Sequence, residues 1–201
     1  APAGGLTTAT PPGDGTNTSA GETSNTNLSG RIVAQYDATD DITAYLSYSR
    51  GYKGPAFNVF FNHTAPNNAV PIDDETSNAY EAGFKSRFFD DRLQLNAAGF
   101  YAVYDGFQAN NFINVGGALV STLTNAGKVS TAGFEVDSVF TPTDWWTITG
   151  GVAYTDAKVK AFNPNPITGV PSTFNGTPLP LAPKWTTSVV SEWTAPFVFN
   201  T

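Results

Sequence analysis

The connections between the strand-like segments of this chain alternate between short and long. Segments in which apolar and polar residues alternate cover residues 28–36, 42–50, 74–88, 92–104, 121–140, 145–158 and 184–194. The connections 37–41, 89–91 and 141–144 are short, whereas 51–73, 105–120 and 159–183 are long. A soluble sandwich has no reason to keep this order, but an outer-membrane barrel has short periplasmic turns and long extracellular loops. The pattern predicts an all-β fold, an antiparallel transmembrane β-barrel segment of about seven strands.

The alternation inside each segment predicts one face in lipid and one in a water-filled lumen. Segment 92–104 is the clearest, because Leu93, Leu95 and Ala97 alternate with Gln94 and Asn96. The same parity places a set of charged residues on the polar faces: Arg31, Glu81, Lys85, Arg87, Glu135, Asp137 and Glu192. We expect these to meet water or to pair across strands, as Glu81 and Lys85 are positioned to do.

The composition agrees with barrel strands that have one apolar and one polar face. Charged residues make up 13% of the chain, against about 25% in a typical soluble domain, yet apolar residues reach only 40%. Aromatic residues at 13% argue against a disordered chain. The net charge of −7 lacks the basic footprint of a nucleic-acid-binding protein. With no Cys, disulfides and thiolate nucleophiles are excluded.

Membrane signals of the helical kind are not visible in the sequence. We find no run of about 20 apolar residues and no signal peptide at Ala1, but a transmembrane strand needs only about 9–11 residues. Aromatic residues gather beside the short turns, where an interfacial girdle would lie. They are Tyr36, Phe88, Phe89, Phe140, Trp145, Trp146 and Trp193.

The chain divides into three parts. Residues 1–27 are rich in Gly, Pro, Thr, Ser and Asn, and we expect a mobile polar loop without structure of its own. Residues 28–196 hold the strands. Residues 197–201 are expected to begin a further turn or strand, at which this chain is truncated.

Five segments resemble motifs of the TonB-dependent outer-membrane receptors. They are AYLSYSRGYKG (44–54), ETSNAYEAGFKS (75–86), RLQLNAAGFY (92–101), NAGK followed by GFE (125–135), and LPLAPKW (179–185). The motifs follow the order and spacing of that family, and the resemblance covers about residues 28–196.

The resemblance implies a barrel of about 22 strands that is plugged by an N-terminal domain. Such receptors bind a scarce nutrient (a ferric siderophore, cobalamin or a glycan) and import it with the protonmotive force, through the TonB complex. We recognise neither a plug domain nor a TonB-contacting segment here. We therefore expect a central slice of the barrel wall, whose complete receptor contacts outer-membrane lipid, TonB and a small-molecule nutrient, with no nucleic acid and no cofactor.

The ligand is expected at the long loops, since they combine aromatic and amide side chains. This combination suits a flat, partly polar ligand. The candidate ligand-binding residues are Tyr52, Phe57, Phe60, Phe61, Asn62, His63, Phe107, Asn110, Asn111 and Phe112, and the second loop also carries Gln108 and Asn114. We expect no metal site, because His63 is the only His and no Cys accompanies it.

We find no catalytic constellation and predict that the protein is not an enzyme. No G-x-S-x-G occurs, and the pairs Asp73–Asp74 and Asp90–Asp91 lie in connections, where they suit capping. Two alternatives stay open beside an active importer. One is a passive porin-like barrel, and the other is a soluble β-rich carbohydrate-binding module.

Overall fold

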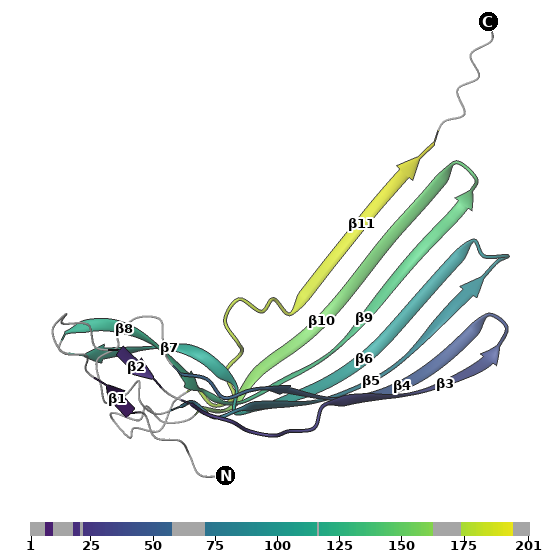
Figure 1. Ribbon diagram of the computed structural model, residues 1–201. Coiled ribbons are helices and arrows are strands. Elements are labelled where there is room, and N and C mark those ends of the chain that lie inside the picture. Colours follow the sequence, from purple (N-terminus) through teal and green to yellow (C-terminus); the bar gives the residue numbers. More distant parts are fainter. Residues whose placement is uncertain are drawn as a thin grey trace, which may run out of the picture.

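A computed structural model describes residues 7–9, 18–20, 22–57, 71–115, 117–162 and 174–194. Seven long strands form one antiparallel sheet in the order β11-β10-β9-β6-β5-β4-β3 (Figure 1). Their bounds are β3 (Gly30–Thr39), β4 (Ile42–Lys53), β5 (Glu75–Phe88), β6 (Leu93–Asp105), β9 (Gly127–Thr143), β10 (Trp146–Phe162) and β11 (Trp185–Trp193).

The predicted fold class is confirmed. The sheet is curved and open, with β3 and β11 at its two edges, so it is part of a barrel wall (Figure 1). The short turns lie together at one end, which we call the turn end, and the long connections lie at the other, the loop end (Figure 1). Within the described ranges there is no helix that is both long and apolar enough to cross a bilayer.

One predicted connection differs from the structure. Residues 105–120 were expected to be irregular, but β7 (Gln108–Val115) and β8 (Ala118–Asn125) pair as a separate hairpin at the loop end. The strand predicted from residue 121 therefore begins only at Gly127, which has a φ of 116°. The physical reason is the Gly-Gly sequence at 116–117, a strong signal for a two-residue hairpin, in which Gly117 has a φ of 91°.

The N-terminal part also contains more structure than we expected. Within residues 1–27, β1 (Thr7–Ala9) pairs with β2 (Thr18–Ala20). The division at residue 28 stays a prediction, and residues 197–201 lie outside the described residues.

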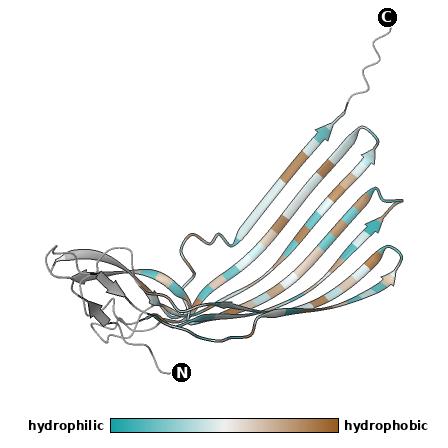
Figure 2. Ribbon diagram, viewed as in Figure 1, coloured by the Kyte–Doolittle hydropathy of each residue, from teal (hydrophilic) through white to brown (hydrophobic). Residues whose placement is uncertain are grey.

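The register sorts the side chains onto two faces as the parity predicts. On the outer face Ala97 lies opposite Val136, and Val136 opposite Val152, whereas on the inner face Asn96 lies opposite Asp137. Hydrophobic and hydrophilic residues alternate along the strands (Figure 2). Val189 on the outer face is 76% exposed, and no large side chain of the described residues is fully buried. The sheet is thus a wall that presents its apolar face outward.

Two rows of aromatic residues border the outer apolar band. Trp146 and Tyr154 on β10 are eight positions apart, as are Trp185 and Trp193 on β11, which matches the about 9–11 residues of a membrane-crossing strand. At the turn end the rings of Trp146 and Trp193 stack with centroids 4.7 Å apart. At the loop end the centroids of Tyr154 and Trp185 are 4.9 Å apart. The spacing of the two rows fits the hydrocarbon core of a bilayer.

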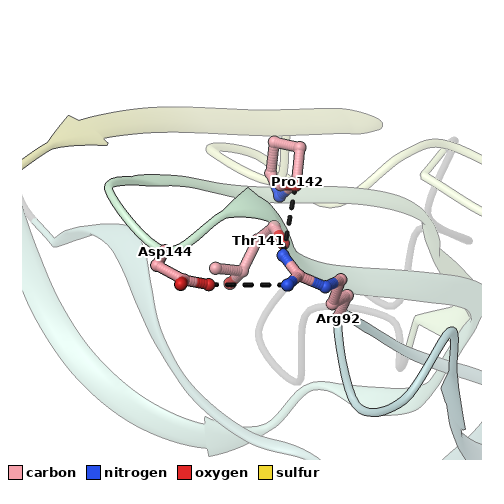
Figure 3. Close-up of polar contacts among 4 residues, drawn as sticks. All are labelled: Arg92, Thr141, Pro142 and Asp144. Atoms are coloured by element: carbon pink, nitrogen blue, oxygen red, sulfur yellow. Dashed lines mark hydrogen bonds and ion pairs between the residues drawn. The ribbon is translucent and has the colours of Figure 1, made fainter.

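Arg92 connects two turns at the turn end. Its guanidinium donates hydrogen bonds to the main-chain oxygens of Thr141 (3.4 Å) and Pro142 (3.2 Å) and contacts the carboxylate of Asp144 at 3.5 Å (Figure 3). The Thr141 N–H in turn donates to the Arg92 carbonyl at 2.8 Å. The β5–β6 turn is thereby fastened to the β9–β10 turn.

Candidate functional site

The described candidate residues gather at the loop end. Tyr52 lies near the end of β4, Phe57 follows a bridge between Ala56 and Ile72, and Phe107 lies between β6 and β7. Asn110 is exposed on β7. The four come from both long connections, so the structure brings the two predicted sets to the same end of the wall.

The remaining candidates are less completely placed. Asn111 and Phe112 belong to β7 and pair with Thr122 and Ser121 of β8 through the backbone. Phe60, Phe61, Asn62 and His63 lie outside the described residues. Tyr52 has the parity of Tyr48, so it belongs to the outer face of the wall and not to the inner face below the loops.

A buried amide organises the base of the loops. The side chain of Gln108 donates hydrogen bonds to the carbonyls of Gly54 and Asp73, both at 2.9 Å, and its backbone N–H donates to the Glu75 carboxylate at 2.8 Å. Gln108 is 6% exposed. It therefore joins the first long connection to the second, and the prediction that it faces the ligand with the other amides is not supported by this burial.

Asn125 completes this network from the end of β8. Its side-chain oxygen accepts the Asp73 N–H at 2.7 Å, and its amide donates to the Asp73 and Gly106 carbonyls, both at 2.8 Å. We call Gln108, Asn125, Asp73 and Gly106 the loop base. The backbone N–H and carbonyl of Asp73 are therefore satisfied by side-chain amides without a strand partner.

Gly106 is required for this arrangement. Its φ is +69°, and a Cβ at this position would fall 2.5 Å from the carbonyl oxygen of Asp74. A side chain would therefore meet both backbone strain and a steric clash. Sequence reasoning missed Gly106, Asp73 and Asn125 as site residues. The signal that was available is a Gly directly after a clear strand, at position 106, and the Asn-Ala-Gly sequence at 125–127 where β9 begins.

The segment before β3 is tied to the same region. Asn25 and Asn27 donate hydrogen bonds to the two carboxylate oxygens of Asp74, at 2.9 and 3.1 Å. Arg50 donates to the side-chain oxygen of Asn27 at 3.4 Å. Asp74 thus accepts hydrogen bonds from two side-chain amides, and the capping role expected for this acidic pair stays a prediction.

One aromatic candidate is placed directly against the loop base. The ring of Phe107 lies 6.3 Å from that of Tyr104 in an edge-to-face arrangement, and its backbone N–H donates to the Gly127 carbonyl at 2.8 Å. The side-chain oxygen of the neighbouring Gln108 is buried and has no hydrogen-bond partner within the described part of the chain. Phe107 is therefore a half-buried ring whose backbone N–H and carbonyl are both hydrogen-bonded, to Gly127 and Ala126.

The inner face below the loops is polar and hollowed. One hollow of about 410 Å³ is lined by Arg31, Gln35, Tyr45, Glu81 and Lys85. A second of about 190 Å³ continues past Tyr45 and Lys85 to Glu135 and Asp137. Of the two residues expected to pair across strands, Glu81 on β5 hydrogen-bonds the side chain of Tyr45 on β4, whereas Lys85 lies opposite the uncharged Thr43 and Asn96. In the described ranges, no three His, Cys, Asp or Glu side chains gather in a way that would hold a metal ion.

Comparison with known proteins identifies a protein family that this chain matches. Residues 7–200 match the family model described as TonB dependent receptor-like, beta-barrel. The pesticin receptor of Yersinia pestis is 32% identical over 134 residues, which are 66% of this chain and 19% of the relative. A probable TonB-dependent siderophore receptor of Acinetobacter baumannii, PiuA, is 26% identical over 163 residues, covering 76% of this chain and 21% of the relative.

Solved structures share the fold. The ferric yersiniabactin uptake receptor FyuA from Yersinia pestis superposes with a TM-score of 0.65 at 24% identity, over 87% of this chain and 24% of that one. The siderophore receptor PiuA from Acinetobacter baumannii gives a TM-score of 0.63 at 21% identity, over 88% of this chain and 24% of that one. The chain spans about a fifth of the length of the curated relatives that it matches.

Proposed function

The chain belongs to the TonB-dependent receptor β-barrel family, and from this membership we propose that it is part of the wall of a receptor that binds and imports a ferric siderophore. Proteins of this family lie in the Gram-negative outer membrane. The observation that carries the proposal is the match of residues 7–200 to the barrel model, together with relatives that are named for siderophore uptake.

The loop end supports ligand binding in the proposed receptor. Phe57, Phe107 and Asn110 lie at the end of the wall that we assign to the cell exterior. Aromatic rings give stacking area to a planar chelate, and amides adapt their hydrogen bonds to its polar groups. The loop base holds Phe107 in position before a ligand arrives, which lowers the entropy cost of binding.

The other predicted ligand residues remain part of this proposal. They are Tyr52 at the side of the loop end, Asn111 and Phe112 on β7, and Phe60, Phe61, Asn62 and His63 outside the described residues. The polar, hollowed inner face around Lys85 suits a hydrated lumen through which a bulky chelate passes. We assign the driving force to the protonmotive force, delivered through TonB by parts of the receptor beyond this chain.

Uptake of radioactive iron by whole cells tests the proposal. We would delete the gene for the full-length receptor, restore it on a plasmid, and measure 55Fe entry from a panel of ferric siderophores with and without a protonophore. We expect uptake of at least one chelate that needs both the receptor and the protonmotive force. Entry that is insensitive to the protonophore would instead support a passive porin-like barrel, and recovery of the protein without detergent would support a soluble module.

A matched pair of variants connects uptake to the loop end. Phe107→Ala removes a ring at the loop end, whereas Phe89→Ala removes an exposed ring at the turn end. We expect Phe107→Ala to weaken chelate binding about tenfold, as for a central aromatic contact that is worth about 1.4 kcal/mol. Phe89→Ala should leave binding unchanged. Equal effects would show that the loop end is not the binding site.

A further inference from the structure

We propose that the loop end selects ferric chelates that carry no net charge and discriminates against anionic chelates. The inference rests on the proposed function and names the class of chelate. Three hydroxamates, each a monoanion, neutralise iron(III), whereas three catecholates, each a dianion, leave the complex trianionic. The ligand is therefore a chelate of the hydroxamate kind, recognised by ring contacts and by hydrogen bonds to uncharged groups.

The long connections of this chain carry no charged side chain in their sequence. The ranges 54–72, 106–127 and 161–183 contain no Asp, Glu, Lys or Arg. At the average of 13% for the whole chain, ranges of this length would each contain about two or three charged residues. The charged residues begin directly beyond the ranges, at Lys53 and Asp73, at Asp105 and Lys128, and at Lys160 and Lys184.

The described parts of these three ranges lie at the same end of the wall. They are residues 54–57 and 71–72, residues 106–115 and 117–127 with the β7–β8 hairpin, and residues 161–162 and 174–183 (Figure 1). A bridge between Ala56 and Ile72 closes the first, and Gln108 joins the first to the second. A bridge between Lys158 and Pro178 fastens the third to β10. A ligand at the loop end therefore meets segments without charge.

The third connection adds a ring and an amide to those of the other two. Phe174 is 56% exposed, and its ring lies 5.5 Å from that of Phe162 in an edge-to-face arrangement. The side-chain oxygen of the neighbouring Asn175 accepts the Phe162 N–H at 2.8 Å. Together with Phe107 and the exposed Asn110, these residues offer aromatic surface and amide groups to an uncharged ligand.

The charged residues that border the second connection and the start of the first lie beside opposite charges. Asp105 pairs with Lys128 at 2.9 Å. Both residues have outer-face parity, since Asp105 shares the face of Ala97 and Lys128 that of Val136. On the inner face Lys53 lies opposite Glu75. These cations thus have a carboxylate nearby before a ligand arrives.

The lysines that border the third connection gather around a carboxylate. Asp156 forms an ion pair with Lys158, and both have the outer-face parity of Val152. Lys160 and Lys184 also act electrostatically on Asp156. The positive charge at this edge of the loops is therefore centred on the outer face of the wall and not on the inner face.

The inner face below the loops does not attract anions either. Its two hollows are lined by the carboxylates of Glu81, Glu135 and Asp137 against the cations of Arg31 and Lys85. A chelate that leaves the loops for the lumen thus meets more carboxylates than cations in these hollows. Like charges repel, so the lumen favours an uncharged chelate over an anionic one.

Desolvation supplies the selectivity. An anionic chelate that binds between uncharged loops loses hydration, and no cation within the loop sequences compensates this loss. An electroneutral chelate loses less hydration and gains the same ring contacts and hydrogen bonds. The discrimination therefore comes from a cost imposed on the anion and not from an attraction to the neutral chelate.

The test measures chelate binding to the purified full-length receptor by equilibrium dialysis with 55Fe. The probes are ferrichrome, which is an electroneutral trishydroxamate, and ferric enterobactin, which is a trianionic tris-catecholate. Two synthetic chelates complete the set, in which the same tripodal triamine carries either three hydroxamates or three catecholates. We expect each electroneutral chelate to bind at least about tenfold more tightly than its trianionic counterpart.

The dependence on salt gives a second readout. The Debye length falls from about 10 Å at 0.1 M to about 3 Å at 1 M ionic strength, which screens interactions between charges. We expect this change to alter the affinity for the electroneutral chelates by less than about twofold. A ligand held by ion pairs would lose affinity instead.

A charge series at one exposed position tests the sign of the effect. Asn110→Gln keeps β7 uncharged and sets the reference. Relative to it, Asn110→Lys should strengthen binding of the trianionic chelate about fivefold at low ionic strength, and Asn110→Glu should weaken it by a similar factor. The electroneutral chelate should bind all three variants alike. Ala38→Lys adds the same charge at an exposed position of the turn end and should leave both affinities at the wild-type values.

The outcomes separate the two proposals. A trianionic chelate that binds wild type as tightly as its electroneutral counterpart, or a chelate affinity that falls steeply with salt, would overturn the selection of uncharged chelates and leave the receptor function standing. Absence of both binding and uptake for every ferric chelate would overturn the receptor function itself, and this inference with it.

Discussion

The ring of Tyr45 lies over the backbone of Gly83 on the inner face of the wall. The two residues are directly opposite on β4 and β5, and a Cβ added to Gly83 would fall 2.8 Å from both Cζ and Oη of the tyrosine. Phe100 lies over Gly133 in the same way, with Cζ 2.8 Å from a Cβ built there. An aromatic ring that covers a glycine shields the backbone without narrowing the lumen.

The first prediction concerns this contact. Gly83→Ala should destabilise the barrel by about 1–3 kcal/mol, because the added methyl also lies 2.5 Å from the Ala97 carbonyl, which cannot move freely. Gly30→Ala is the control, since nothing lies within 4 Å of its Cβ position. Urea unfolding of the full-length receptor in detergent gives both free energies. Equal stability of the two variants would contradict the close approach.

The second prediction tests the assignment of the faces. Leu95→Arg or Val136→Arg should cost about 2–4 kcal/mol if these side chains meet lipid at mid-bilayer. Asn96→Arg, one position from Leu95, should cost much less because its side chain meets water. Refolding titrations into lipid vesicles measure the difference. A cost for Asn96→Arg as large as that for Leu95→Arg would mean that the faces are reversed.

The third prediction concerns the connection between turns. Arg92→Met removes the hydrogen bonds to Thr141 and Pro142 and the contact with Asp144. Because this guanidinium is half exposed, we expect a loss of about 0.5–1 kcal/mol of unfolding free energy. The control Arg87→Met breaks only the exposed pair with Asp91 and should change stability by less. If both variants cost the same, the carbonyl contacts of Arg92 add nothing.

The fourth prediction separates support of the loops from contact with the ligand. Asn125→Ala leaves the N–H of Asp73 without its partner, so we expect faster hydrogen exchange at Asp73 and quicker proteolysis of both long connections. Because this hydrogen bond is exposed, its loss should cost about 0.5–1.5 kcal/mol. Asn110→Ala, on an exposed position of β7, should weaken chelate binding while leaving exchange at Asp73 unchanged. Unaltered hydrogen exchange at Asp73 in the Asn125→Ala variant would contradict the role of the loop base in supporting the long connections.

Much of the wall could be predicted because the alternation of side chains along a strand depends only on residues that are close in the sequence. Side chains alternate with period two, so a few neighbours decide that Leu95 faces one way and Asn96 the other. Six of the seven strands lie within a few residues of the predicted segments, and the fold class is confirmed. The exception is β9, whose start was misplaced because β8 directly before it is also a strand.

The loop end shows what local reasoning could not reach. Gln108 has the composition of a ligand-facing amide, but it is buried between Gly54 and Asp73, which lie 54 and 35 positions away. Arg92 is 50 positions from its partner Pro142, and Asn125 is 52 positions from its partner Asp73. The alternation of residues within one segment does not predict hydrogen bonds between residues that are so far apart in the chain.

The sequence by itself therefore determined six of the seven wall strands, the face that their side chains occupy, and the family that the motifs resemble, because each depends on spacing within one segment. Only the tertiary structure decided that β7 and β8 form a separate hairpin between β6 and β9, and that Gln108 is buried between the two long connections. These relations follow from the register between strands, which sets distances between residues that are far apart in the chain.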